Sequence, residues 1–155
     1  MTPPFSNSYW LEPGQIVCGE YPRDFDDLED HEGMAALLAA GVRMFIDLTE
    51  PGELKPYDSI ARGTAQMMGI DPRALTFHRH PIRDVSVPET TQDMQAILRT
   101  IRLGRHLGKT LYLHCWGGRG RTGTVAGCVL NEVFGNRGED ALTQLNERWR
   151  ACAKS

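Results

Sequence analysis

The 155-residue sequence contains few cysteines, and those at positions 18, 115, 128 and 152 lie far apart. Zinc sites and disulfide frameworks use closely spaced or paired cysteines, so the sequence predicts neither a metal centre nor a disulfide scaffold. Scattered thiols are typical of a reducing compartment, which favours a cytoplasmic location. One alternative stays open, a regulatory disulfide from Cys115 to Cys18 or Cys128.

Long apolar runs, repeats and an excess of positive charge are also absent. No apolar run approaches the roughly 20 residues that span a bilayer, and the first eight residues lack the basic start and apolar core of a signal peptide. The formal net charge is −3, which excludes a general attraction to nucleic acid or acidic membranes. We therefore expect one domain over residues 1–155, outside the membrane and without nucleic-acid binding, in which proline-rich residues 1–14 form an extended tail.

Strand-like and helix-like segments alternate along the chain. Apolar, β-prone stretches predict strands at 15–19, 42–48, 75–81 and 110–114, and helical periodicity predicts helices at 32–40, 57–68, 88–107, 122–134 and 139–151. This alternation indicates an α/β fold with a central, mostly parallel sheet of four to five strands flanked by helices. Two stripes are expected to face the core, the first at Met94, Ile97, Leu98, Ile101 and Leu107 and the second at Leu142, Leu145 and Trp149.

Two clusters of metal-ligating residue types have simpler interpretations. His78 and His80 share one face of a predicted strand, but without a third ligand nearby a structural role is favoured over a metal site. The acidic segment 24–32 is interpreted as a solvated loop or helix start rather than a site for a metal or a basic partner. No metal or cofactor is expected.

The segment 114–124 carries the chemistry, and it reads His-Cys-Trp-Gly-Gly-Arg-Gly-Arg-Thr-Gly-Thr. A predicted strand leads in and a predicted helix leads out, so loop amides and a helix N-terminus converge on one point and favour an anion there. A cysteine at such a point ionises readily, and Arg121 can hold two oxygens of a tetrahedral anion. The predicted phosphate cradle is formed by Trp116, Gly117, Gly118, Arg119, Gly120 and Arg121.

The pattern His114-Cys-x-x-Gly-x-x-Arg-Thr122, followed by Gly123, resembles the active-site motif of cysteine-dependent protein tyrosine phosphatases. A bare Cys-x5-Arg also occurs in rhodaneses and arsenate reductases, but the flanking residues make this match more specific. The short chain and the element order are similar to the dual-specificity branch. The resemblance implies hydrolysis of phosphotyrosine in a protein or peptide, with phosphoserine and phosphothreonine as further substrates, through a phosphocysteine intermediate.

The resemblance also implies roles for individual residues. Cys115 would be the nucleophile, Arg121 would hold the phosphoryl oxygens, and Thr122 would donate a hydrogen bond to the Cys115 sulfur. His114 would support the loop from beneath, either by packing alone or by tuning the thiol. The general acid of the family would be Asp84, directly after a predicted strand, with Asp71 and Asp93 as weaker candidates.

Trp116 and Arg119 leave alternatives open. Trp116 either stacks on an aryl ester or packs beneath the loop, and Arg119 either faces solvent or favours multiply phosphorylated substrates, because basic residues there occur in lipid-phosphatase relatives. The resemblance extends neither to the tyrosine-recognition segment nor to the water-positioning glutamine of the larger enzymes, which favours a shallow pocket. The alternative functions are a phosphoinositide or inositol-phosphate phosphatase, a non-catalytic phosphate-binding module and a thiol redox enzyme.

Overall fold

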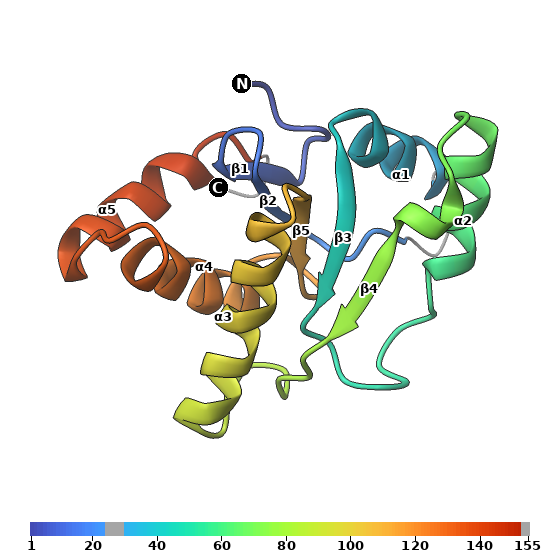
Figure 1. Cartoon of the computed structure of the whole chain (residues 1–155). Coiled ribbons are helices and arrows are strands. Elements are labelled where there is room, and N and C mark those ends of the chain that lie inside the picture. Colours follow the sequence, from blue (N-terminus) through green and yellow to red (C-terminus); the bar gives the residue numbers. More distant parts are fainter. Residues whose placement is uncertain (24–29, 153–155) are drawn as a thin grey trace.

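The chain folds around a central sheet (Figure 1). The structure is a computed structural model that describes residues 1–23 and 30–152, over which five strands pair in the order β1-β2-β5-β3-β4. The pairs among β2, β5, β3 and β4 are parallel, and β1 is antiparallel to β2. The strands are β1 (Ser8–Glu12), β2 (Ile16–Gly19), β3 (Val42–Asp47), β4 (Thr76–Arg79) and β5 (Thr110–His114). The mostly parallel sheet predicted from sequence is confirmed.

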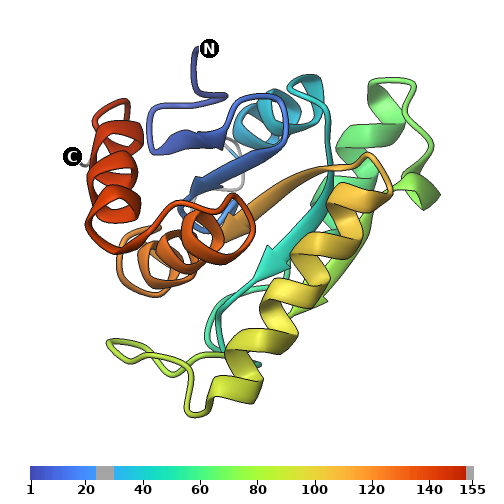
Figure 2. The same ribbon diagram turned by 60° about the vertical axis from the view of Figure 1, so that its left-hand side comes forward.

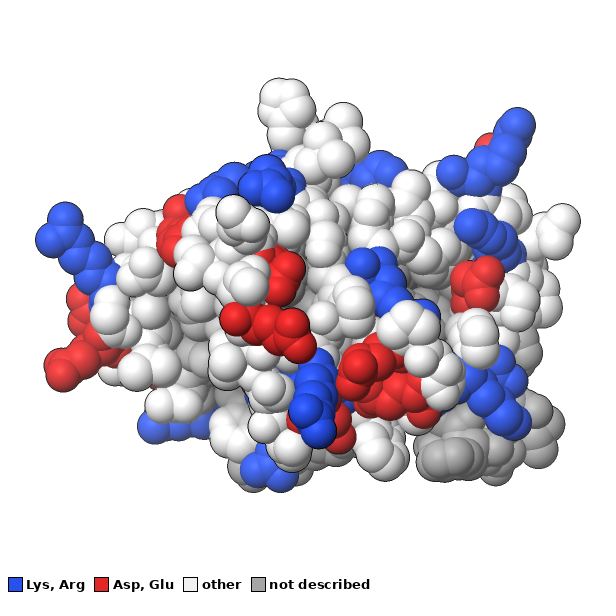
Figure 3. Space-filling view, turned by 90° about the horizontal axis from the view of Figure 1, so that it is seen from below, with Lys and Arg blue, Asp and Glu red and all other residues white. Residues whose placement is uncertain are grey.

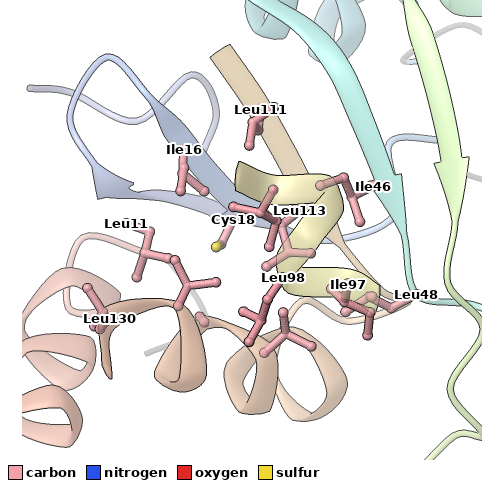
Figure 4. Packing of buried hydrophobic residues seen from close by; sticks show 14 of the residues in the cluster. Leu11, Ile16, Cys18, Ile46, Leu48, Ile97, Leu98, Leu111, Leu113 and Leu130 are labelled. Atoms are coloured by element: carbon pink, nitrogen blue, oxygen red, sulfur yellow. The ribbon is translucent and has the colours of Figure 1, made fainter. Parts of the chain in front are cut away.

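Helices cover both faces of this sheet. They are α1 (Asp30–Ala39), α2 (Asp58–Met67), α3 (Thr91–His106), α4 (Gly120–Glu132) and α5 (Gly138–Trp149), with a short 3₁₀ turn at Pro72–Ala74. Successive strand residues point to opposite faces, so Leu111 and Leu113 of β5 join the cluster with α3, α4 and α5, whereas Tyr112 joins the cluster with α1 and α2. Figure 4 shows Leu111, Leu113 and Ile97 within the first cluster. Two hydrophobic layers therefore enclose the sheet.

Residues 1–14 are not a tail, which corrects the expectation from sequence. Strand β1 pairs with β2 through Ser8↔Gly19 and Trp10↔Val17, and the side chains of Tyr9, Trp10 and Leu11 are buried. A turn through Pro13 and Gly14 joins the two strands. Gly14 has a φ of 75° there, a backbone conformation that glycine adopts readily and most residues avoid. Proline and glycine were therefore the marks of a hairpin turn rather than of a free terminus.

The predicted core stripes are correct except at one position each. Leu107 and Leu142 are 57% and 60% exposed. On α3 the buried position is Gly104, where a Cβ would lie 2.4 Å from Leu111 Cδ2 and 2.5 Å from Met44 Sδ. The helix therefore approaches the sheet closely at Gly104, a residue without a side chain. A prediction based on the spacing of apolar side chains does not identify such a position.

Helix α3 begins later than expected from Pro88. The Thr90 side chain accepts a hydrogen bond from the Asp93 amide at 3.0 Å and so caps the helix. Residues 80–90 therefore form a loop that extends beyond the carboxyl ends of the strands (Figures 1 and 2).

Most of the acidic segment that the sequence analysis interpreted as a solvated loop or helix start, residues 24–29, lies outside the described residues.

The carboxyl ends of β3, β4 and β5 bring three loops together. The Leu48 amide donates to the His114 carbonyl at 3.0 Å, and the Ile82 amide donates to the Leu48 carbonyl at 2.9 Å. Parallel sheets place their ligand sites at this edge.

No helix of the described residues is both long enough and apolar enough to cross a bilayer.

Candidate active site

The loop after β5 is held against the end of β2. Gly118 has a φ of +74°, and a Cβ there would lie 2.4 Å from the Gly19 carbonyl carbon. The Tyr21 amide donates a hydrogen bond to the Trp116 carbonyl at 2.9 Å. Only glycine satisfies both the conformation and the close approach at position 118. This fixed backbone holds the loop of Cys115, which is 3% exposed and directly follows β5, against the start of α4.

The start of α4 is open to an anion. Its N-cap residue is Arg119, whose side chain makes no capping hydrogen bond. The first amides of a helix have no partner within the helix, and the helix dipole adds partial positive charge beside them. The structure therefore has the strand, loop and uncapped helix start on which the expected anion site depends.

Arg121 is oriented by a carboxylate that the sequence analysis missed. Its side chain is 2% exposed, and both terminal nitrogens donate to Glu53, Nη1 to Oε1 and Nη2 to Oε2, each at 2.8 Å. Nη1 also donates to the Ile82 carbonyl at 3.0 Å. The hydrogen bonds from Arg121 lower the pKa of Glu53, and the bonded carboxylate raises the pKa of Arg121. Both groups therefore stay charged near neutral pH.

This pairing leaves one edge of the Arg121 guanidinium for a ligand. Glu53 takes one N–H from each terminal nitrogen, and Ile82 takes the second N–H of Nη1. The two remaining donors, Nε–H and the second Nη2–H, lie on the same edge. Within residues 1–23 and 30–152 no hydrogen bond from Nε is formed. Two parallel donors are the arrangement that grips two oxygens of a phosphate.

Asp84 lies beside Arg121 at the mouth of the site. Its Oδ1 is 3.4 Å from Arg121 Nη2 and accepts a hydrogen bond from the Val85 amide at 2.9 Å, while the side chain is 56% exposed. The weaker candidates lie in other settings. Asp71 caps the 3₁₀ turn and pairs with Arg73, and Asp93 belongs to the first turn of α3.

These groups surround a pocket of about 450 Å³. It is lined by Glu20, Asp84, Val85, Cys115, Trp116, Gly117, Arg119, Gly120 and Arg121. Most of the predicted cradle therefore faces one cavity, whereas Gly118 packs on Gly19 instead. Trp116 is 52% exposed and does not pack beneath the loop.

His114 lies under the loop and is fully buried. Its Nδ1 is 3.4 Å from the Cys115 carbonyl, which can only accept, so Nδ1 carries the proton and Nε2 accepts from the Tyr57 hydroxyl at 2.6 Å. The rings of Tyr21, Tyr57 and Tyr112 surround the imidazole. Burial lowers the pKa of His114 to about 4, so the ring is neutral at pH 7. Tyr57 was not identified from sequence, because it precedes the motif by a long stretch of chain.

This pKa predicts a loss of stability in acid. An unfolded histidine gains its proton near pH 6.5, whereas His114 in the folded chain does so only near 4, so stability falls as the pH drops through this window. Between pH 7 and pH 5 the loss from this residue is about 2 kcal/mol. Urea unfolding at the two pH values should show it in the wild type and not in His114→Gln. The exposed His106→Gln serves as control, and an equal pH dependence in wild type and His114→Gln would disprove the assignment.

Thr122 is buried, but its Oγ1 has no hydrogen-bond partner among the described residues. The predicted bond to the Cys115 sulfur is therefore not formed in this structure. Thr122 is not among the residues that line the catalytic pocket, although an unpaired buried hydroxyl is costly. The proposed role of Thr122 stays a prediction.

All four cysteines are free thiols. Cys18 is fully buried, and burial raises its pKa to about 12. Burial also raises the pKa of Cys128 on α4. Both are therefore poor nucleophiles in the folded chain, and the regulatory disulfide considered from sequence is not formed. No group of three metal-ligating side chains occurs within residues 1–23 and 30–152, and His80 instead bonds Thr100 at 2.8 Å.

Comparisons with known proteins agree with this geometry. Among solved structures, PTPMT1 in complex with PI(5)P has a TM-score of 0.70 at 17% identity, and the match covers 94% of this chain and 85% of that one. TpbA of P. aeruginosa in complex with pTyr has a TM-score of 0.66 at 16% identity, covering 94% and 75%. At such identities these structures show a shared fold.

Sequence relatives carry the comparison further. "Putative tyrosine phosphatase 067L" of Invertebrate iridescent virus 3 is 30% identical over 119 residues, covering 75% of this chain and 42% of that protein. The chain thus spans about two fifths of the length of the curated relatives it matches, 42% for 067L and for its counterpart 197R of Invertebrate iridescent virus 6. The family model "PTP-SAK: Swiss Army Knife protein, DSP-PTPase phosphatase domain" matches residues 5–154. With this match over nearly its whole length, the chain belongs to the DSP-PTPase family of cysteine-dependent phosphatases.

Proposed function

We propose that this chain hydrolyses phosphomonoesters on proteins, phosphotyrosine foremost, with Cys115 as nucleophile. The observation that carries the proposal is the convergence of Cys115, the open start of α4 and the Nε edge of Arg121 on one pocket. The Asp84 carboxylate lies at its mouth, 3.4 Å from Arg121. The viral relative named as a tyrosine phosphatase and the neighbour solved with pTyr support the same substrate.

The reaction would proceed in two displacements at phosphorus. The Cys115 thiolate attacks, the bond from phosphorus to the ester oxygen breaks, and protonated Asp84 gives its proton to that oxygen. Ionised Asp84 then takes a proton from the water that attacks the phosphocysteine, and the S–P bond breaks to release phosphate and regenerate the thiolate. Arg121 and the α4 amides would hold the equatorial oxygens in both steps.

Glu53 would act as a positioning residue for Arg121. We expect Glu53→Gln to lower kcat/KM for p-nitrophenyl phosphate about tenfold, because one charged acceptor of the fork is lost. The matched control is Glu50→Gln, the same change at an exposed position of the same loop. Equal activity of the two variants would contradict the role.

The mouth of the pocket favours an aromatic phosphate. Val85 is fully exposed and Trp116 is 52% exposed, and both line the pocket, where they could contact a phosphotyrosine ring.

Figure 3 shows the face toward which the strand carboxyl ends point, and there basic and acidic side chains are intermixed. Docking on an anionic lipid surface usually uses a continuous basic patch. The phosphoinositide alternative is favoured by Arg119 and by the neighbour solved with PI(5)P.

Phosphate release from a substrate panel tests the proposal. We expect kcat/KM to fall in the order phosphotyrosine peptide, phosphoserine or phosphothreonine peptide, short-chain phosphoinositide, with release unchanged by EDTA. A Cys115→Ser preparation controls for contaminating phosphatases. Faster release from the phosphoinositide than from every peptide would replace the protein substrate by the lipid one.

A further inference from the structure

A second pocket, of about 210 Å³, adjoins the catalytic pocket. It lies between the catalytic loop and α5 and is lined by Tyr9, Gly118, Arg119, Gly123, Leu145, Asn146 and Trp149. The two pockets share Arg119. A substrate group attached near the scissile phosphate could therefore pass from one to the other along this side chain.

The Arg119 side chain is held at this boundary by Trp149. Its guanidinium carbon lies 5.3 Å from the centre of the indole ring, a cation–π contact. Trp149 is half-buried and packs against the hydrophobic cluster between the sheet, α4 and α5. Arg119 itself is exposed and, across residues 1–23 and 30–152, forms no ion pair. The Arg119 charge is thus held at the boundary of the two pockets, and no carboxylate of the described residues neutralises it.

We propose that Arg119, positioned by Trp149, forms a subsite for a second anionic group on a phosphopeptide substrate. The inference rests on the proposed function. A guanidinium held over an indole ring by a cation–π contact keeps N–H donors for a carboxylate or a second phosphate. The Asn146 amide, which lines the same pocket, adds a neutral donor.

The shape of the second pocket favours a peptide over an inositol ring. Its walls beyond Arg119 are apolar at Leu145 and Trp149, and Gly123, where a Cβ would have no neighbour within 4 Å, leaves room for a main chain to approach. Its volume suits one amino-acid side chain. The intermixed charges seen in Figure 3 offer no continuous basic surface for a densely phosphorylated head group.

The test compares phosphotyrosine peptides that differ in one neighbouring residue, Glu, Gln or phosphoserine. We expect wild type to prefer the Glu and phosphoserine peptides over the Gln peptide about five- to tenfold in kcat/KM. This preference should shrink at high salt, because the contact is exposed. Arg119→Ala and Trp149→Ala should bring the ratio close to one, Trp149→Phe should keep most of it, and the control Arg99→Ala on α3 should leave it unchanged.

A wild-type ratio near one, or a ratio that persists in Arg119→Ala, would overturn the subsite. If Trp149→Ala does not fold, Arg119→Lys replaces it, and full selectivity in Arg119→Lys would contradict the need for a guanidinium held by Trp149. An added-anion preference among inositol phosphates but not among peptides would also overturn it. Failure of the proposed function would be seen separately in the substrate panel, as faster release from the phosphoinositide than from every peptide or as no release from any substrate.

Discussion

Replacing Cys115 by serine should abolish turnover and leave the binding of phosphate analogues intact. A serine hydroxyl has nearly the shape of the thiol but does not ionise near neutral pH, so the attack on phosphorus is lost. The Arg121 fork, held by Glu53 and Ile82, does not depend on the sulfur. We expect kcat to fall at least about 10⁴-fold.

The loss is measured with p-nitrophenyl phosphate, and binding is measured by calorimetry with tungstate. Cys128→Ser is the matched control, because it makes the same exchange at a half-buried thiol of α4 outside the pocket. We expect it to keep wild-type turnover. Turnover by Cys115→Ser at the level of the control would refute the phosphocysteine mechanism. Loss of tungstate binding would show instead that the sulfur is needed to form the cradle.

Asp84→Asn should slow the hydrolysis of esters with poor leaving groups about 10²- to 10⁴-fold, the range typical of a general acid. An amide cannot protonate the departing oxygen, so the rate should fall more steeply as the phenol becomes more basic. Esters with good leaving groups should lose less. Asn preserves the size of the side chain and can accept from the Val85 amide as Asp84 does.

A series of aryl phosphates provides the measurement, with the logarithm of kcat/KM plotted against the pKa of the leaving phenol. Asp93→Asn and Asp71→Asn are matched controls, because neither residue lines the catalytic pocket. We expect the wild-type slope in both controls. A wild-type slope in Asp84→Asn would assign the proton transfer to another group.

The contiguous motif explains how much of the site could be predicted. His114 to Thr122 form a strand end, a glycine loop and a helix start, so their relative positions follow from local geometry. Asp84 was expected only from the family resemblance, and it lies beside Arg121 because the parallel strands before the two residues end at the same edge of the sheet. Helix periodicity identified most of the α3 core face but not Gly104. At this position the helix and the sheet lie so close that only glycine fits, and glycine adds no apolar side chain to the periodic pattern.

The sequence by itself determined the α/β order, the anion-binding loop and the identity of its thiol and guanidinium, since these depend on residues that are neighbours in the chain or repeat with a helical period. Only the tertiary structure decided that Glu53 orients Arg121, that Tyr57 bonds His114 and that Trp149 holds Arg119. Each of these contacts joins segments far apart in the chain. Their pairing depends on how helices and loops pack around the sheet, which no local spacing encodes.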